Sequence, residues 1–550
     1  MKQSFISVIA ICFSPLVLQA DPSAPVDRVP ALIPQPLRIQ VQEGHTGFSM
    51  AEGIRVHHSV SRSELGRAAV RALMAAGVSV LPEEDHDELQ VELVERDNRE
   101  WYAVSVSPKG ILLQVAHEQA LHLAAQTLAQ SLVQDSSGQP ALPAMEVEDE
   151  PLLPYRGLML DPCRHPLSVD DICKMLRLMA RYKLNRLHWH LADDQGWRIQ
   201  IRSYPRLTEV GSHRAETPTL ANHEVGDGTP TQPFFFTQDD IRHVVNYAHS
   251  LGIIIIPEIE VPGHSSAAIA AYPELGNRDI GDYAPRVATT WGVLPYTYAP
   301  GKRSLVFLEA VFTEVCELFP MAEFVHIGGD EAPRDQWNRS AAARRFMQEH
   351  GLRHTGQIQH WFTHRLAELM ARHGRRIIGW DEIIDDGEVP SDAVVMYWRS
   401  WVRPSSLLRA LQAGHDVIQS PDSHFYFNFS QGKLPADPAY KPHGSLLAEQ
   451  DWRHVYSYNP IPSGISDEQR RHLIGLQANC WSESIADIDK LEYQTVPRIC
   501  ALAEVAWRPA ELRCPEDFLR RLPAHYGWFE AQGINYRRED GTPAHQVQKD

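Results

Sequence analysis

The chain has 550 residues, 43% of them hydrophobic and 22% charged, and its formal net charge is −18. This length suffices for two or three domains with at least one large core, and the composition is ordinary for a globular protein. The excess of acidic residues argues against a general affinity for nucleic acid or anionic membrane surfaces, so no nucleic-acid partner is expected.

Residues 1–20 have the pattern of a secretory signal peptide. Lys2 supplies the positive start, residues 6–18 are mostly apolar, and Ala20 is a small residue at the expected cleavage position. The apolar stretch is too short and too interrupted to predict a membrane span, and no other stretch predicts one. We therefore expect an exported protein, periplasmic or secreted, with no transmembrane segment.

A linker at 21–36, rich in proline and small residues, leads into a region at 37–150 that we expect to form a small α+β domain. Two segments with alternating apolar and polar residues predict half-buried strands, and two with helical spacing predict helices: 37–41 and 89–93, and 63–76 and 118–133. Because this region holds no concentrated set of reactive residues, we expect it to support the structure rather than to carry chemistry.

The larger region, 151–540, repeats one unit eight times. Each unit is a short apolar run followed by a helical segment, and the runs are 157–160, 184–191, 253–256, 324–327, 376–378, 393–397, 416–418 and 474–478. Nearly continuous apolar runs are typical of strands buried on both faces of a parallel sheet. The pattern predicts a (β/α)8 TIM barrel as the catalytic domain. An open doubly wound sheet is the alternative, but no glycine-rich phosphate loop supports it. The polar tail, 541–550, is expected to be disordered.

Aromatic and charged residues gather at the predicted strand ends, which is where chemistry lies in a barrel. Trp380, Trp398 and Trp481 each follow a strand, in company with carboxylates, an arginine and histidines. Tryptophan rings pack on the C–H groups of a sugar, while carboxylates and amides bind its hydroxyls. One tryptophan at a strand end is usually a packing residue, but three at corresponding ends favour a sugar-binding site.

The segment His326–Glu331, with sequence HIGGDE, places two carboxylates side by side after a strand. Neighbouring side chains on a strand point to opposite faces, so two adjacent acids share one pocket only where the strand has become irregular. Gly328 and Gly329 permit such a backbone. Glycoside hydrolysis needs one acid to protonate the leaving oxygen and a second group to stabilise the positive charge at the anomeric carbon. An isolated Asp-Glu pair would instead be a solvated turn.

Three other patterns allow different interpretations. His188 and His190 point to one face of a strand, and such a pair can bind a metal ion, although packed and hydrogen-bonded histidines are commoner. Residues 263–267 resemble a nucleophile elbow that lacks its last glycine. The six cysteines after the signal peptide show no metal-type spacing, so we expect mostly buried free thiols with one unassigned disulfide at most.

Taken together, the motifs resemble those of family 20 glycoside hydrolases, the β-N-acetylhexosaminidases. They are DPCRH at 161–165, HWHLADDQGWR at 188–198, PGH at 262–264, HIGGDE at 326–331, GWDE at 379–382, YWR at 397–399 and WSE at 481–483. The resemblance spans roughly 37–540. It implies an exo-acting, retaining enzyme without a cofactor or metal that removes terminal β-linked GlcNAc or GalNAc through an oxazolinium intermediate formed by the substrate's own acetamido group.

The resemblance also implies a role for each matched residue. Glu331 corresponds to the general acid and later base, Asp330 to the group that orients the acetamido N–H, and Tyr426 to the donor to its oxygen. Trp380, Trp398 and Trp481 correspond to the walls of the sugar site, and Arg164 and Glu483 to ligands of the C3 and C4 hydroxyls. Asp193 and His264 correspond to a buried pair that supports the general acid. Two close carboxylates disfavour simultaneous ionisation, which would help to keep Glu331 protonated.

One position departs from the family pattern. Many members carry Leu-Asp after the tyrosine, and the acid contacts the C6 or C4 hydroxyl, whereas this chain has Phe427-Asn428. An amide both donates and accepts, so the preference at C4 and C6 stays open. A metal-dependent barrel hydrolase and a catalytically silent sugar-binding protein remain the competing interpretations. The natural substrate, chitin fragments or other glycans, stays open as well.

Overall fold

The computed structural model describes residues 29–42, 47–57, 59–83, 87–219, 222–432 and 450–545. The predicted signal peptide at 1–20 lies outside the described residues, as do the start of the predicted linker and the last five residues of the predicted tail. The domain boundaries given above therefore stay predictions at both ends of the chain.

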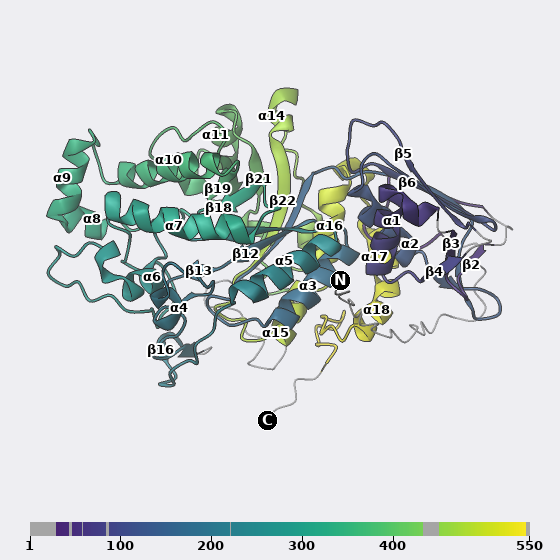
Figure 1. The fold of residues 1–550 in the computed structure, drawn as a ribbon, viewed down its shortest axis with the longest axis horizontal. Coiled ribbons are helices and arrows are strands. Elements are labelled where there is room, and N and C mark those ends of the chain that lie inside the picture. Colours follow the sequence, from purple (N-terminus) through teal and green to yellow (C-terminus); the bar gives the residue numbers. More distant parts are fainter. Residues whose placement is uncertain are drawn as a thin grey trace, which may run out of the picture.

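Eight parallel strands close into a barrel, which confirms the predicted TIM fold (Figure 1). In order around the barrel they are β11 (Tyr155–Leu160), β12 (Arg186–His190), β17 (Ile254–Glu258), β18 (Phe324–His326), β19 (Arg376–Trp380), β20 (Val394–Tyr397), β21 (Val417–Gln419) and β22 (Leu473–Cys480). The last strand closes on the first, with Leu160 opposite Cys480 in the register. All eight predicted apolar runs are strands of this barrel.

Alternation along the strands builds two cores from one set of apolar runs. Ile377 and Val395 belong to the core between the barrel and its helices, whereas their neighbours Ile378 and Met396 belong to the core inside the barrel. Helices that follow the strands include α3 (Val169–Arg181), α5 (Gln238–Ser250), α7 (Lys302–Leu318), α10 (Gly356–Arg372), α11 (Ser406–Gln412) and α16 (Arg498–Trp507). Successive side chains of a strand point to opposite faces, so a continuous apolar run fills both cores.

Short elements fill the long loops of the barrel. The helices are α4 (Arg206–Glu209), α6 (Ser266–Ala271), α8 (Asp335–Arg339), α9 (Ala341–Glu349), α12 (Asp422–Phe425), α13 (Trp452–Tyr456), α14 (Asp467–Arg471), α15 (Ile488–Thr495), α17 (Pro515–Arg521) and α18 (Tyr526–Ala531), and the hairpins pair β13 (Ala192–Asp193) with β14 (Gly196–Trp197) and β15 (Pro218–Thr219) with β16 (Asn222–Gly226).

The N-terminal part is a separate α+β unit with its own core. Its main sheet has the order β1 (Arg38–Val41), β10 (Met145–Asp149), β6 (Tyr102–Ser107), β7 (Gly110–Val115) and β5 (Leu89–Leu93). Helices α1 (Glu64–Ala75) and α2 (Ala120–Gln130) share its core, and the short strands are β2 (Phe48–Ser49), β3 (Ile54–His57), β4 (Val80–Glu83), β8 (Val133–Gln134) and β9 (Pro140–Leu142). The predicted strands and helices of this region are all present.

Buried polar contacts join the two parts. Arg156, at the start of β11, forms two hydrogen bonds with Glu100, which precedes β6, at 2.7 and 2.8 Å. Trp507, at the end of α16, packs in the core of the N-terminal unit and donates its indole N–H to Asp149 at 2.9 Å. Figure 1 shows α16 between the barrel and the smaller N-terminal unit, which is drawn in purple and blue.

Two further findings concern the predictions on membranes and disulfides. Within the described ranges, no helix has the combination of length and apolarity that a membrane crossing needs. The six cysteines after residue 20 are all free in the structure; five are buried, and Cys514 is exposed.

Candidate active site

The backbone after β18 explains how two adjacent acids face one site. Gly328, Gly329 and Glu331 all have positive φ values, 65°, 99° and 48°. Gly329 cannot be replaced without strain, and Gly328 has no room for a side chain, because a Cβ there would overlap with Glu260 Oε2. The left-handed conformation of Glu331 is uncommon for this residue type and is found mostly where function requires it. The strand is thus irregular where the sequence predicted it.

Asp330 and Glu331 differ in exposure. The side chain of Asp330 is 13% exposed, whereas that of Glu331 is 37% exposed. Burial raises the pKa of Asp330 to about 6; nearby His264 opposes the rise and the Glu331 carboxylate adds to it. The effect of two close carboxylates is therefore seen at the more buried acid of the pair.

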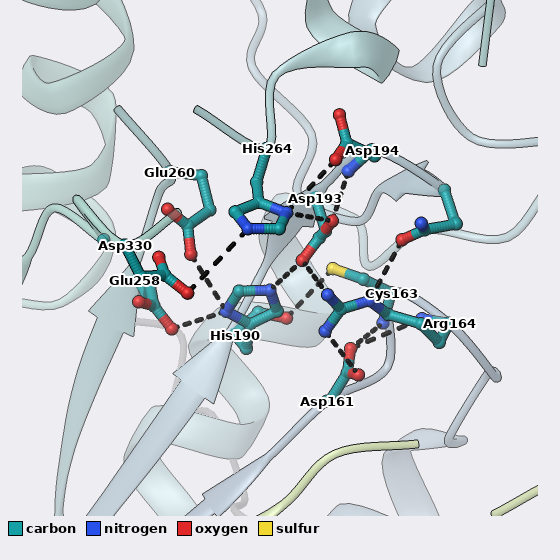
Figure 2. A network of polar contacts seen from close by, with 12 residues as sticks. Asp161, Cys163, Arg164, His190, Asp193, Asp194, Glu258, Glu260, His264 and Asp330 are labelled. Atoms are coloured by element: carbon teal, nitrogen blue, oxygen red, sulfur yellow. Dashed lines mark hydrogen bonds and ion pairs between the residues drawn. The ribbon is translucent and has the colours of Figure 1, made fainter. Parts of the chain in front are cut away.

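His264 connects these two acids to a second acidic pair. Its Nδ1 lies 3.1 Å from Asp194 Oδ2 and 3.3 Å from Asp193 Oδ1, and its Nε2 lies 3.8 Å from Asp330 Oδ2 (Figure 2). The same Nε2 lies 3.7 Å from Glu331 Oε2. Burial alone would lower the pKa of His264, but the Asp193 and Asp330 carboxylates raise it well above its usual value. The structure thus brings the predicted pair Asp193 and His264 together and adds Asp194, which the sequence analysis did not single out.

Arg164 is held by acids beside this centre. Its guanidinium contacts Asp161 Oδ2 at 3.0 Å and Asp193 Oδ2 at 2.7 Å, and it lies over the Trp481 ring at 5.1 Å from the ring centre. Glu483 is near enough that Arg164 opposes the rise that burial causes in the Glu483 pKa. Both predicted hydroxyl ligands therefore lie at one side of the site.

Four aromatic rings form a continuous wall inside the carboxyl end of the barrel. Trp398 stacks on Tyr426 with centroids 6.0 Å apart, Tyr426 lies 6.3 Å from Trp481, and Trp481 lies 5.8 Å from Trp380. The period of two explains their direction: Trp380 and Trp398 follow the inward-facing Ile378 and Met396 by two residues. The three predicted tryptophans and the predicted tyrosine are thus brought together.

Asn428 is 5% exposed and lies two residues after Tyr426. Its backbone carbonyl accepts a hydrogen bond from Gln494, and its side-chain Oδ1 is buried with no partner among the residues that the structure describes. The side chain is therefore buried with an unused acceptor, in the segment that follows the wall residue Tyr426.

The sequence analysis missed the residue that joins the acidic centre to the wall. Glu258 contacts three histidine rings, with Oε2 at 2.5 Å from His190 Nδ1 and 2.9 Å from His188 Nε2, and Oε1 at 2.7 Å from His326 Nδ1. Trp380 donates its indole N–H to Glu258 at 3.0 Å. Burial alone would raise the pKa of Glu258, but the histidines hold it well below its usual range.

The histidines that suggested a metal site are parts of this hydrogen-bonded arrangement. His190 bridges Glu258 and Asp193, since its Nε2 lies 2.8 Å from Asp193 Oδ2. Gln477 donates to His188 Nδ1 at 3.0 Å. The signal for these residues was present in the sequence, because strand alternation puts His188 and His190, and likewise Glu258, on the inward face.

Comparisons with known proteins agree with this geometry. Residues 153–510 match the family model described as glycosyl hydrolase family 20, catalytic domain, and residues 29–150 match that of glycosyl hydrolase family 20, domain 2. A beta-hexosaminidase of Porphyromonas gingivalis is 41% identical over 72% of this chain, and the alignment covers 48% of that relative. A beta-hexosaminidase of Vibrio furnissii is 31% identical over 86% of this chain and 76% of its own length.

Solved structures show the same similarity. The GH20 exo beta-N-acetylglucosaminidase from Vibrio harveyi in complex with N-acetylglucosamine has a TM-score of 0.81 at 29% identity, over 96% of this chain and 81% of that one. The Streptomyces plicatus N-acetyl-beta-hexosaminidase in complex with Thio-NAglucal has a TM-score of 0.76 at 27% identity, over 94% and 97% of the two chains.

Proposed function

The chain belongs to glycosyl hydrolase family 20 and is a glycoside hydrolase, and we propose that it is an exo β-N-acetylhexosaminidase that removes terminal, non-reducing β-linked N-acetylhexosamine. The relatives' names and the N-acetylglucosamine complex of the Vibrio harveyi enzyme support this substrate class. The Porphyromonas gingivalis relative is about twice as long as its aligned part, so the natural substrate is not carried over from it.

The sugar sits against the aromatic wall. Trp380, Trp398 and Trp481 enclose the ring and its acetamido group, because apolar C–H faces of a sugar pack on indole rings. Arg164 and Glu483 bind the C3 and C4 hydroxyls at the other side of the site. Polar groups placed in this way fix the orientation of the sugar.

In the first step the acetamido carbonyl oxygen attacks the anomeric carbon. Glu331 gives its proton to the glycosidic oxygen as the bond to the leaving group breaks, which yields an oxazolinium ion and a neutral alcohol. Asp330 accepts a hydrogen bond from the acetamido N–H and stabilises the positive charge on that group. Tyr426 donates a hydrogen bond to the acetamido oxygen. Asp330 must be ionised for this role.

In the second step water attacks the anomeric carbon of the oxazolinium ion. Glu331, now a carboxylate, takes the proton of that water, and the electron pair returns to the acetamido oxygen. Two inversions at one carbon give a product of retained configuration. Glu331 acts on the same face of the sugar in both steps, because the leaving group departs from that face and water arrives at it.

The observation that carries this proposal is the convergence of the two acids. Although they are neighbours in the sequence, their carboxylates lie 3.8 and 3.7 Å from the same His264 nitrogen. A surface turn or a silent binding site has no need of such convergence at the cost of a left-handed Glu331.

The test is a panel of 4-nitrophenyl β-glycosides of GlcNAc, GalNAc and glucose, assayed with and without a chelator. The expected result is hydrolysis of the two N-acetylated substrates, slow or absent cleavage of the glucoside, and no effect of the chelator. Comparable rates on the glucoside would overturn substrate assistance, and loss of activity with the chelator would favour a metal-dependent hydrolase.

We also propose that the enzyme works outside the cytoplasm, in the periplasm or medium. The support is the sequence pattern of residues 1–20. N-terminal sequencing of the protein purified from its own cells tests this: a mature chain starting at Asp21 is expected, and an intact residue 2 in a cytosolic fraction would refute export.

A further inference from the structure

Glu260 is a buried acid that the mechanism above does not use. It lies two residues after β17 and is 2% exposed, and both of its carboxyl oxygens are buried without a hydrogen-bond partner among the described residues. Its carboxyl lies against the backbone of Gly328, where even a methyl group would overlap with Oε2. The first glycine of the HIGGDE segment therefore makes room for this carboxyl, two residues before Asp330.

The groups that face Glu260 come from four parts of the barrel. Two are acids, Asp330 after β18 and Glu258 on β17, and two are histidines, His264 after β17 and His190 on β12, whose Nδ1 lies 3.9 Å from Glu260 Oε1. The fifth is the phenol of Tyr298, in the loop before α7. Figure 2 shows the Glu260 carboxyl beside His264 and above Asp330, with one oxygen directed toward His190.

This environment favours the neutral form of Glu260. Burial raises the pKa of Glu260 well above its usual value, the Asp330 and Glu258 carboxylates raise it further, and the two histidines oppose the rise without cancelling it. A neutral carboxyl has an O–H donor and a carbonyl acceptor, whereas a carboxylate has acceptors only. The environment therefore favours the form of Glu260 that can donate a hydrogen bond.

Two neighbours of Glu260 have unused bonding capacity that fits a neutral acid. Asp330 Oδ1 is a buried acceptor and the Tyr298 hydroxyl is a buried donor, and neither has a hydrogen-bond partner in the described part of the chain. Buried polar atoms are almost always paired, so unpaired donors and acceptors that lie together call for an explanation. A proton on Glu260 supplies a donor for the buried Asp330 acceptor, whereas a carboxylate at Glu260 supplies none.

We propose that Glu260 is a positioning residue for the reaction, a neutral acid whose O–H donates to the inner oxygen, Oδ1, of Asp330. The hydrogen bond stabilises Asp330 as a carboxylate and leaves its outer oxygen, Oδ2, free for the acetamido N–H. The inference rests on the proposed function, because ionised Asp330 matters only if the acetamido group takes part in the reaction. An ionised Glu260 would instead add a second buried negative charge beside Asp330.

The test compares Glu260→Gln with Glu260→Leu through the pH dependence of kcat/KM on 4-nitrophenyl β-GlcNAc. Ionised Asp330 is present above its pKa and is lost as the pH falls through it, so the acid limb of the wild type is expected near pH 6. Glutamine keeps a neutral donor, so its acid limb stays in place. Leucine removes the donor, which disfavours the carboxylate, so its acid limb moves up by about one pH unit.

A packing role would lower kcat/KM in both variants without moving either limb, and that result would overturn the proposal. So would an equal upward shift in both variants, because the donor would then be irrelevant.

Difference infrared spectra of wild type and Glu260→Gln at pH 7 give a second test if the leucine variant does not fold. The carbonyl band of a protonated carboxyl is expected in the wild type and missing in the variant, and its absence from the wild type would refute a neutral Glu260. This readout does not depend on hydrolysis. If the proposed function were wrong, the wild type would not hydrolyse 4-nitrophenyl β-GlcNAc, and this would be seen before any variant is compared.

Discussion

The domain interface and the active site are both built from buried polar residues, but they differ in how completely these are paired. At the interface Arg156 meets Glu100 through two hydrogen bonds, and Trp507 donates to Asp149. At the active site His264 Nε2, Asp330 Oδ1 and both oxygens of Glu260 have no hydrogen-bond partner among the described residues. Unpaired groups are costly in a protein interior, so their concentration at one end of the barrel needs a reason.

The difference separates stability from function. The paired contacts at the interface fix the two domains in one arrangement and leave no free donor or acceptor for a ligand. The active-site network keeps donors and acceptors in reserve for the substrate and holds its acids close together, which a stability role would avoid. Changes at the site should therefore affect catalysis with little effect on unfolding, and changes at the interface should do the reverse.

The largest effect is expected for Glu331→Gln. The amide cannot protonate the glycosidic oxygen, so kcat/KM on 4-nitrophenyl or natural β-GlcNAc substrates should fall by roughly 10²–10⁴-fold. A 2,4-dinitrophenyl leaving group departs without a proton, so the loss on that substrate should be much smaller. The melting temperature should stay close to that of the wild type, because the Glu331 side chain is 37% exposed. An equal loss on both leaving groups would place the general acid elsewhere.

Arg156→Met should have the opposite profile. It removes both hydrogen bonds to Glu100 and leaves that carboxylate mostly buried and unpaired, which should lower the free energy of unfolding by about 3 kcal/mol. The kcat/KM of the folded protein should not change, because Arg156 lies at the start of β11 and the site lies after its end. Denaturant unfolding and steady-state kinetics measure the two quantities.

The matched control for that variant is Arg38→Met. Its partner in the same N-terminal unit is Glu148 at 3.0 Å, but the two side chains are 81% and 43% exposed. An exposed pair of this kind contributes at most about 1 kcal/mol. If the two methionine variants lost the same stability, the contrast between interface and surface pairs would be wrong.

The smallest effect is expected at Asn428, whose side-chain acceptor is buried without a partner among the described residues. If it faces the C6 end of the sugar, Asn428→Asp adds a charge that repels a 6-sulfate. The ratio of kcat/KM for GlcNAc over 6-sulfo-GlcNAc aryl glycosides should then rise by about fivefold, the equivalent of about 1 kcal/mol. An unchanged ratio would mean that Asn428 does not contact the C6 substituent.

Much of this architecture was predictable from local patterns. Apolar runs of strand length predicted all eight barrel strands, and the position of Trp380, Trp398 and Trp481 after those strands predicted the aromatic wall. The adjacent acids and glycines predicted an irregular backbone after β18, which the positive φ values confirm. Each of these signals is local, because it lies within one strand or in the residues that directly follow it.

The rest depends on contacts between distant segments. Glu258 meets His190 across 68 positions of the chain, and Asp194 meets Ser266 across 72. Only the assembled barrel shows which oxygen of Asp330 lacks a hydrogen-bond partner. Only the assembled barrel shows that Glu260 fills the space beside Gly328. The resemblance to a family named the reacting residues, but the unpaired atoms behind them were visible only in three dimensions.

The central claim is that the substrate's own acetamido oxygen is the nucleophile, and one series of substrates tests it most directly. Aryl β-glucosaminides with N-acetyl, N-fluoroacetyl, N-difluoroacetyl and N-trifluoroacetyl groups differ in little but the electron density on that oxygen. Fluorine withdraws electrons, so kcat/KM should fall at every step of the series and kcat should fall with it. Rates that do not change across the series, or a glycosyl group trapped on an enzyme carboxylate, would contradict the account.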